Sequence, residues 1–151
     1  MARGAVRCGA VRCGAVRCAQ IFRRLRGRKI LVRGNHDKKR TTDLARHAQH
    51  DLATPKLDGG RWVFSHSPLR AWVGAFRGSR HCLAHTHGLL PDTAQSCDVG
   101  VDRWGYRPAS LEEIRGRMAA TPDVPEEIRP GRAMEAEGEN RGALCPNSVR
   151  Y

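Results

Sequence analysis

Three short segments of this 151-residue chain carry side chains that could bind a cation or transfer a proton. They are Gly-Asn-His-Asp at 34–37, Ser-His-Ser-Pro at 65–68 and His-Thr-His-Gly at 85–88. An asparagine carbonyl is a hard oxygen ligand, an imidazole can bind a metal or shuttle a proton, and a neighbouring carboxylate can fix an imidazole's tautomer. Each segment taken singly could equally be a polar turn without chemistry. Together they predict one site.

The two histidines of the third segment are two residues apart, so in extended backbone they point to the same side and can reach one metal cluster. We therefore predict metal ligation by four residues in all: Asn35, His66, His85 and His87.

Each of the three segments follows a short apolar run that is typical of a strand, at 29–33, 61–64 and 80–84. Strands of an open α/β sheet deliver the residues that follow them to the sheet edge, where such proteins place their chemistry. The turn residues at 58–60 predict a hairpin before the second of these strands. Alternation of polar and apolar residues over 97–102 predicts a further strand.

Three helical segments are expected around these strands. Residues 19–28 resemble the end of a helix that Gly27 stops, and a short helix is predicted from Thr41 or Thr42 through residue 50, with His47 and His50 on its exposed face. A capping box at 110–113 predicts a helix up to about residue 118. Trp72 is expected to pack in the core or a lid rather than to face a substrate.

The sequence predicts a central domain between two tails. Residues 4–18 repeat Gly-Ala-Val-Arg-Cys three times, and a period of five matches neither a helix nor a strand. That repeat could be a basic arm for nucleic acid or membrane phosphates, a cysteine metal clip, or low-complexity sequence without a packed structure. Residues 120–151 are rich in Pro, Glu, Gly and Arg. We predict a low-complexity repeat at 1–18, a domain at 19–119 and a disordered tail at 120–151.

Charge and cysteine usage restrict the partners of the chain. Residues 1–40 carry thirteen lysines and arginines against one acid, Asp37, so the whole net charge of +12 lies there. Nucleic acid is thus a partner only through the basic N-terminal arm. No apolar run approaches the roughly 20 residues that cross a bilayer, so no membrane partner is expected. The six cysteines are expected to be free thiols of a cytoplasmic protein, and the oligomeric state is not indicated.

The three segments, in this order and spacing, resemble the later motifs of the calcineurin-like metallophosphoesterases. Residues 99–114 (Val-Gly-Val-Asp-Arg-Trp-Gly-Tyr-Arg-Pro-Ala-Ser-Leu-Glu-Glu-Ile) are similar to the C-terminal signature of the small bacterial and phage-type members. The resemblance covers residues 19–118.

This resemblance implies an α/β/β/α sandwich that holds two divalent metal ions, such as Mn, Fe or Zn, and hydrolyses a phosphoester substrate. It implies that Asn35, His66 and His85 bind one metal and that His87 binds the other. It also implies that His36 acts as general acid or charge stabiliser and that Asp37 orients it. Two cations would share the phosphate oxygens and lower the pKa of water.

The chain departs from the family at its N-terminal motifs. No Asp-x-His and no Gly-Asp occurs in the sequence, and the repeat stands where these ligands belong. Without a bridging carboxylate two cations would repel each other, so at most one metal is expected. We therefore expect an α/β fold, a partial sandwich lacking its first strands, and an impaired metal-dependent phosphoester hydrolase. The alternatives are a non-catalytic remnant that binds one metal or phosphate, and a nucleic-acid binder acting through its basic arm.

Overall fold

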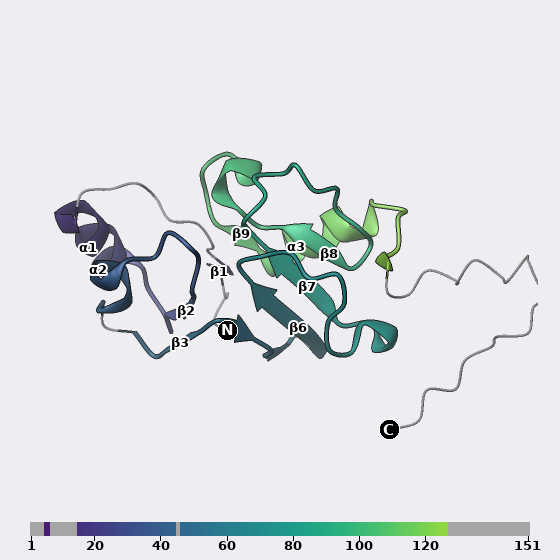
Figure 1. Cartoon of the computed structure of the whole chain (residues 1–151), viewed down its shortest axis with the longest axis horizontal. Coiled ribbons are helices and arrows are strands. Elements are labelled where there is room, and N and C mark those ends of the chain that lie inside the picture. Colours follow the sequence, from purple (N-terminus) through teal and green to yellow (C-terminus); the bar gives the residue numbers. More distant parts are fainter. Residues whose placement is uncertain (1–4, 7–14, 45, 127–151) are drawn as a thin grey trace, which may run out of the picture.

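The protein is a mixed α/β structure, seen here as a computed structural model that describes residues 5–6, 15–44 and 46–126 (Figure 1). Its α-helices are α1 (Ala15–Arg24), α2 (Lys39–Thr42) and α3 (Leu111–Ala119), and its 3-10 turns are η1 (Ala75–Arg77) and η2 (Val101–Trp104). Its strands are β1 (Ala5–Val6), β2 (Ile30–Val32), β3 (Ala48–His50), β4 (Leu52–Ala53), β5 (Lys56–Leu57), β6 (Gly60–Ser65), β7 (Arg80–Leu83), β8 (Ser96–Asp98) and β9 (Ala109–Ser110).

The largest sheet has five strands in the order β4-β6-β7-β8, with β5 also pairing with β6. Strands β6, β7 and β8 run parallel, whereas β4 and β5 run antiparallel to β6. The predicted hairpin is confirmed: Asp58 (φ 46°) and Gly59 (φ 74°) form a tight turn between β5 and β6, with the positive φ values that such turns require. The predicted strand at 80–84 is confirmed as β7. The strand predicted over 97–102 ends at Asp98, because η2 begins at Val101.

The prediction of a helix through residue 50 is wrong. The helix α2 ends at Thr42, and β3 pairs in parallel with β2 from Ile30↔Ala48 to Val32↔His50. Backbone pairing with a distant strand thus overrides the local helical pattern. The strand predicted at 29–33 is present, but it is not buried: Ile30 is 50% exposed, because β2 pairs only with β3 among the described strands.

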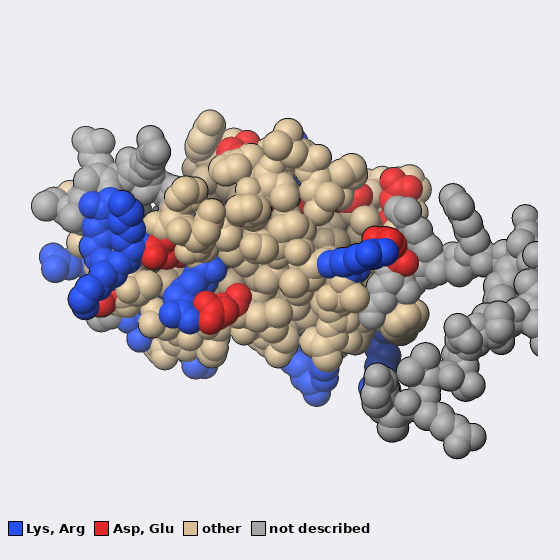
Figure 2. Space-filling model, in the orientation of Figure 1, with Lys and Arg blue, Asp and Glu red and all other residues tan. Residues whose placement is uncertain are grey.

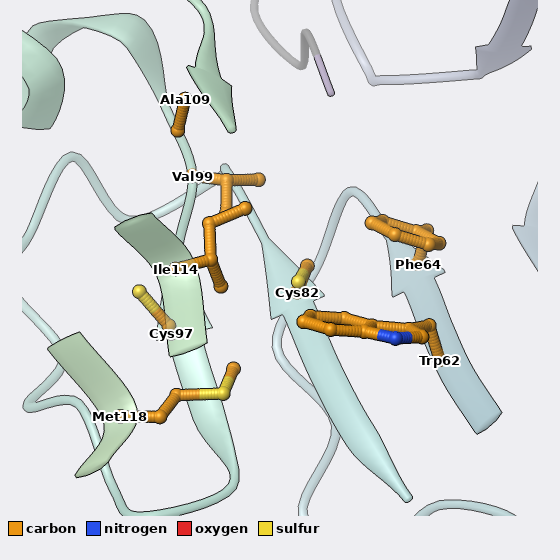
Figure 3. Close-up of a cluster of buried hydrophobic side chains, with 8 residues drawn as sticks. All are labelled: Trp62, Phe64, Cys82, Cys97, Val99, Ala109, Ile114 and Met118. Atoms are coloured by element: carbon orange, nitrogen blue, oxygen red, sulfur yellow. The ribbon is translucent and has the colours of Figure 1, made fainter. Parts of the chain in front are cut away.

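The core lies on both faces of β6. Alternate residues of a strand point to opposite faces, so Trp62 and Phe64 join one cluster and Val63 joins the other. In the larger cluster, Ile114 and Met118 of α3 pack over the sheet (Figure 3). The full set in that cluster is Trp62, Phe64, Cys82, Cys97, Val99, Ala109, Ile114 and Met118. On the other face Val63 packs with Trp72 and Ala75, which confirms the expectation of core packing for Trp72.

The helix α3 has the N-terminus that the sequence predicts. The Ser110 side chain accepts a hydrogen bond from the Glu113 backbone N–H, and the Glu113 carboxylate accepts one from the Ser110 N–H. This is the predicted capping box. The Arg107 guanidinium, followed by these Ser110 contacts, lowers the pKa of Glu113 to about 2.

The segments next to the two tails contain described elements and contacts. Helix α1 begins at Ala15, inside the third copy of the repeat, although the period of five predicted no helix there. The Ala94 N–H donates to the Asp123 carbonyl, and Arg70 forms an ion pair with Glu126, so the residues just after the boundary expected at 119 contact the domain. The predictions of disorder for most of 1–18 and for 127–151 fall outside the described residues.

Helix length, the state of the cysteines and surface charge were each the subject of a prediction. Among the helices of the described ranges, none has the length and apolar composition needed to cross a bilayer. Cys97 is a buried free thiol, as predicted, and Cys82 is also buried, while no side chain of the other four cysteines is described. In Figure 2 the basic side chains gather over the end of the molecule that contains α1 and α2, and mainly uncharged side chains cover the middle.

Candidate functional site

Two of the predicted site segments meet because β6 and β7 are parallel. Strand β6 ends at Ser65 and β7 ends at Leu83, so His66 and His85 leave the same edge of the sheet. The Ala84 N–H donates to the His66 carbonyl at 3.1 Å, which fixes the two strand ends to each other. The two imidazole rings lie edge to face with centroids 4.9 Å apart.

The remaining segment, at 34–37, follows β2 and reaches the same point. The Asn35 side-chain oxygen Oδ1 lies 2.8 Å from His66 Nε2. Its loop sits this close because Gly34 has no side chain: a Cβ there would be 2.8 Å from His66 Nδ1. The turn itself is closed by Asp37, whose carboxylate accepts a hydrogen bond from the Gly34 N–H at 2.8 Å.

Three atoms with lone pairs therefore converge at the strand ends. His66 Nε2 is 2.8 Å from Asn35 Oδ1 and 3.0 Å from His85 Nδ1. Without a cation, one proton on His66 Nε2 can serve both of the other atoms as hydrogen-bond acceptors. A cation satisfies all three, and two ligands at right angles about 2.1 Å from an ion lie about 3.0 Å apart. The donor set thus fits a divalent metal ion.

The electrostatics of His66 favour the form that binds metals. Burial lowers the pKa of His66, the nearby His85 lowers it further, and the carboxylate of Asp37 raises it. His36 and His87 also lower the pKa of His66, which places both of them within electrostatic reach of it. A neutral imidazole is the form that can donate a lone pair to a metal.

His87 does not join the three converging donors through a contact. Its Nδ1 lies 2.6 Å from the carboxylate oxygen Oδ2 of Asp102, and its side chain is 74% exposed. The structure thus brings together three of the four predicted ligands, Asn35, His66 and His85, and pairs the fourth with an acid. Within the described ranges, no three His, Cys, Asp or Glu side chains are grouped to hold a metal ion, since the third donor here is an amide.

The two predicted catalytic residues lie on the loop of Asn35. His36 is exposed, and the Asp37 carboxylate is engaged with the Gly34 backbone. This hydrogen bond gives Asp37 a structural task in the turn. That Asp37 also orients His36 stays a prediction.

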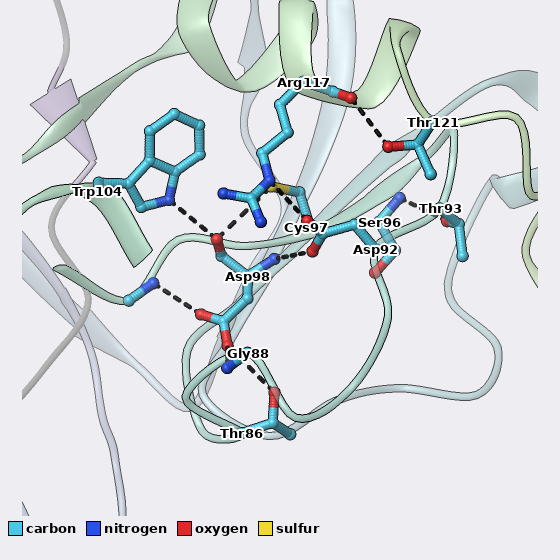
Figure 4. Close-up of polar contacts among 11 residues, drawn as sticks. Thr86, Gly88, Asp92, Thr93, Ser96, Cys97, Asp98, Trp104, Arg117 and Thr121 are labelled. Carbon is cyan, nitrogen blue, oxygen red and sulfur yellow. Dashed lines mark hydrogen bonds and ion pairs between the residues drawn. The ribbon is translucent and has the colours of Figure 1, made fainter. Parts of the chain in front are cut away.

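Asp98 is a site residue that the sequence reasoning missed as such. It is 1% exposed, and its carboxylate accepts hydrogen bonds from the Thr86 hydroxyl and from the N–H groups of Gly88 and Gly100 (Figure 4). These bonds hold the loop that carries His85 and His87. The only prediction that included Asp98 was the strand over 97–102, which assigned its carboxylate no role.

Further side chains hold Asp98 in place and cover the loop at 85–88. The Asp98 N–H donates to Asp92, whose other oxygen accepts from Arg117 of α3 (Figure 4). The Arg103 side chain covers Gly88, where a Cβ would lie 2.4 Å from its Cδ. Gly88 also has a φ of 79°, so the backbone conformation favours glycine there.

Comparisons of this chain with family models, with curated proteins and with solved structures find no match.

Proposed function

We propose that this protein is a metal-dependent phosphoester hydrolase of the calcineurin-like type with a single cation site. The observation that supports this most strongly is the convergence of Asn35 Oδ1, His66 Nε2 and His85 Nδ1. These atoms come from three loops that follow three strands, and all of them can donate a lone pair to the same ion.

One cation, rather than two, is consistent with the charges at the site. None of the three converging donors carries a negative charge, and the nearby Asp37 carboxylate already accepts from the Gly34 N–H. A second cation would be repelled by the first without a bridging carboxylate, and the sequence has no Asp-x-His or Gly-Asp motif to supply one.

The residues suit a phosphoester as substrate. Neutral ligands leave the full positive charge of the ion facing solvent, so it would attract a phosphate group. A bound divalent cation supplies Lewis acidity that polarises a phosphoryl oxygen. The exposed His36, one residue after Asn35, can hold a proton for the leaving oxygen. The substrate's other features, the metal's identity and a cytoplasmic location stay predictions.

Metal binding tests the first half of this proposal. Titration calorimetry of the full chain with Mn²⁺ should give one equivalent, and His66→Ala or His85→Ala should abolish it or weaken it at least about tenfold. His50→Ala is the matched control, because His50 is an exposed histidine of β3 whose side chain has no described contact with Asn35, His66 or His85. Binding of two equivalents, or equal binding by the His66 variant, would contradict the single site.

Catalysis is tested separately with an aryl phosphate and added Mn²⁺. Turnover that disappears in His36→Ala, while Mn²⁺ binding remains, supports the hydrolase. Full metal binding without turnover at any Mn²⁺ concentration supports the alternative, a non-catalytic domain that binds one metal or phosphate.

A nucleic-acid function through the basic arm stays a prediction. Most of residues 1–18 lie outside the described ranges, and the described basic side chains gather near α1 and α2. Affinity for RNA that falls steeply with salt and disappears on deleting residues 1–18 would support it.

A further inference from the structure

The edge of the sheet opposite the candidate metal site contains a hollow with two arginines. It has a volume of about 550 Å³ and is lined by Arg61, Val73, Gly74, Phe76, Arg77 and Ser79. Arg61 lies at the start of β6, five residues before His66, which corresponds to about 16 Å along a strand. This hollow is therefore separate from the three converging donors.

The charge of the lining is positive and uncompensated. No acidic residue lines the hollow, and within the described part of the chain the guanidinium groups of Arg61 and Arg77 have no ion-pair or hydrogen-bond partner. Guanidinium groups form forked hydrogen bonds that match the geometry of a phosphate. The lining thus suits a phosphate monoester or diphosphate more than a neutral ligand.

The hollow also offers an aromatic ring beside these arginines. Phe76 is 74% exposed and Val73 is 52% exposed, so both present apolar surface to a ligand. An exposed phenyl ring can stack on a nucleobase, and this contact tolerates any base because every base has a π face. A volume of about 550 Å³ falls within the range of roughly 300–1,000 Å³ that small-molecule pockets occupy.

The wall that carries Phe76 and Arg77 is fixed by its own contacts. Two left-handed glycines, Gly74 (φ 79°) and Gly78 (φ 73°), bracket the η1 turn. The Ser79 hydroxyl donates to the Val73 carbonyl, and Ala75 is fully buried against the sheet. The two walls also touch, because Arg61 Cδ lies 3.6 Å from the position of a Cβ on Gly74. A preformed hollow loses less entropy on binding than a mobile loop.

We propose that this hollow binds a nucleoside monophosphate, with Arg61 and Arg77 on its phosphate and the Phe76 ring on its base. No part of this site belongs to the candidate metal site, so the proposal stands independently of the hydrolase. It assigns binding only and involves no chemical step.

Calorimetry with 5′-AMP on the full chain, in buffer with EDTA, tests the proposal. AMP should bind with one equivalent, and Arg77→Gln and Arg61→Gln should each weaken it by about tenfold or more, as loss of a charged hydrogen bond does. Arg24→Gln is the matched control, because Arg24 is an exposed arginine of α1, far from β6 and β7 in Figure 1. Circular dichroism should show that all three variants keep the fold, since each substituted side chain is exposed.

Ribose 5-phosphate and a short oligouridylate, together with two further variants, distinguish base binding from phosphate binding. Phe76→Ser should weaken AMP while leaving ribose 5-phosphate unchanged, because only AMP carries a base to stack. Asn35→Ala should leave AMP affinity unchanged, which excludes binding at the strand ends. Undetectable AMP binding, or equal AMP affinity in Arg77→Gln and the native protein, overturns the proposal. Tight binding of a short oligouridylate without AMP binding also overturns it, in favour of single-stranded RNA.

Discussion

Gly34 lies so close to the imidazole of His66 that a single added methyl group would displace a candidate metal ligand. The position of a Cβ on Gly34 is 2.8 Å from His66 Nδ1, closer than real Cβ contacts allow. No unusual φ requires glycine there, so the need for glycine is a matter of space alone. At the scale of single residues, the site is therefore defined as much by an absent side chain as by the donors.

We predict that Gly34→Ala weakens Mn²⁺ binding by about tenfold while the fold remains. The methyl group pushes the His66 ring away from Asn35 and His85, and the donors no longer converge. Calorimetry measures the affinity, and circular dichroism checks the fold. Unchanged Mn²⁺ affinity would mean that the three donors do not bind the ion together.

His81 illustrates a buried polar residue with a complete set of partners. It is fully buried, and the Ser65 hydroxyl, which donates to the Ser67 carbonyl, lies 2.8 Å from its Nε2. Its Nδ1 lies 3.0 Å from the Ser96 hydroxyl. Nε2 thus donates to Ser65 and Nδ1 accepts from Ser96, which is the neutral ring. Burial lowers the pKa of His81 to about 4.

This pKa predicts that the fold loses stability in mild acid. The unfolded chain binds a proton on His81 below about pH 6.5, while the folded chain resists protonation down to about pH 4. The stability that the neutral His81 ring contributes is fully present above pH 6.5. As the pH falls towards 4, the free energy of unfolding decreases by about 3 kcal/mol in total. Urea unfolding at several pH values measures it. His81→Gln should flatten this part of the profile, and an unchanged slope in that variant would refute the assignment.

At the scale of elements, α3 supports both the core and the candidate site. Ile114 and Met118 cover the sheet. Arg117 contacts Asp92, and Asp92 in turn accepts a hydrogen bond from the backbone N–H of Asp98, the last residue of β8. The capping box at Ser110 fixes where this helix begins. A change in α3 should therefore be measurable as a change in global stability.

Two substitutions in α3 should act in opposite directions. Ser110→Ala removes the cap and should lower the free energy of unfolding by about 1 kcal/mol. Gly116→Ala should raise it by up to about 1 kcal/mol, because a Cβ there meets nothing within 4 Å and alanine favours the helix. Chemical denaturation measures both. Destabilisation by Gly116→Ala would contradict the open surface of the helix at that position.

At the scale of the whole molecule, the hydrophobic core is built on the five-stranded sheet, which is covered on both faces. The larger cluster holds Cys82 and Cys97, which are register partners on β7 and β8 and are buried beneath α3. Burial raises the pKa of the Cys97 thiol to about 12. The reactive thiolate of Cys97 is therefore scarce in the folded state.

We predict that iodoacetamide at about pH 8 leaves Cys97 unmodified in the folded protein and modifies it in denaturant. Global unfolding must come first, because β8 is paired with β7 and covered by α3. Peptide mass spectrometry after timed labelling distinguishes Cys97 from the cysteines of the repeat. Native-state labelling of Cys97 as fast as that of an unfolded peptide would show that this part of the core opens readily.

The sequence alone determined the features that depend on neighbouring residues. The strands at β6 and β7, the turn at Asp58 and Gly59 and the capping box at Ser110 all follow from short-range patterns and capping chemistry. It also identified Asn35, His66 and His85 as a group, from their ligand chemistry, from their positions after expected strands and from a family resemblance.

Only the tertiary structure decided what depends on distant pairing. Residues 48–50 form a strand because β2 pairs with them, against their local helical pattern. Asn35 and His66 are 31 positions apart in the sequence, and they meet because β2, β6 and β7 deliver their loops to one place and Gly34 leaves room for the His66 ring. The contacts of the buried Asp98 and the pairing of His87 with Asp102 likewise could not be predicted from the sequence, because the fold decides which groups a carboxylate meets.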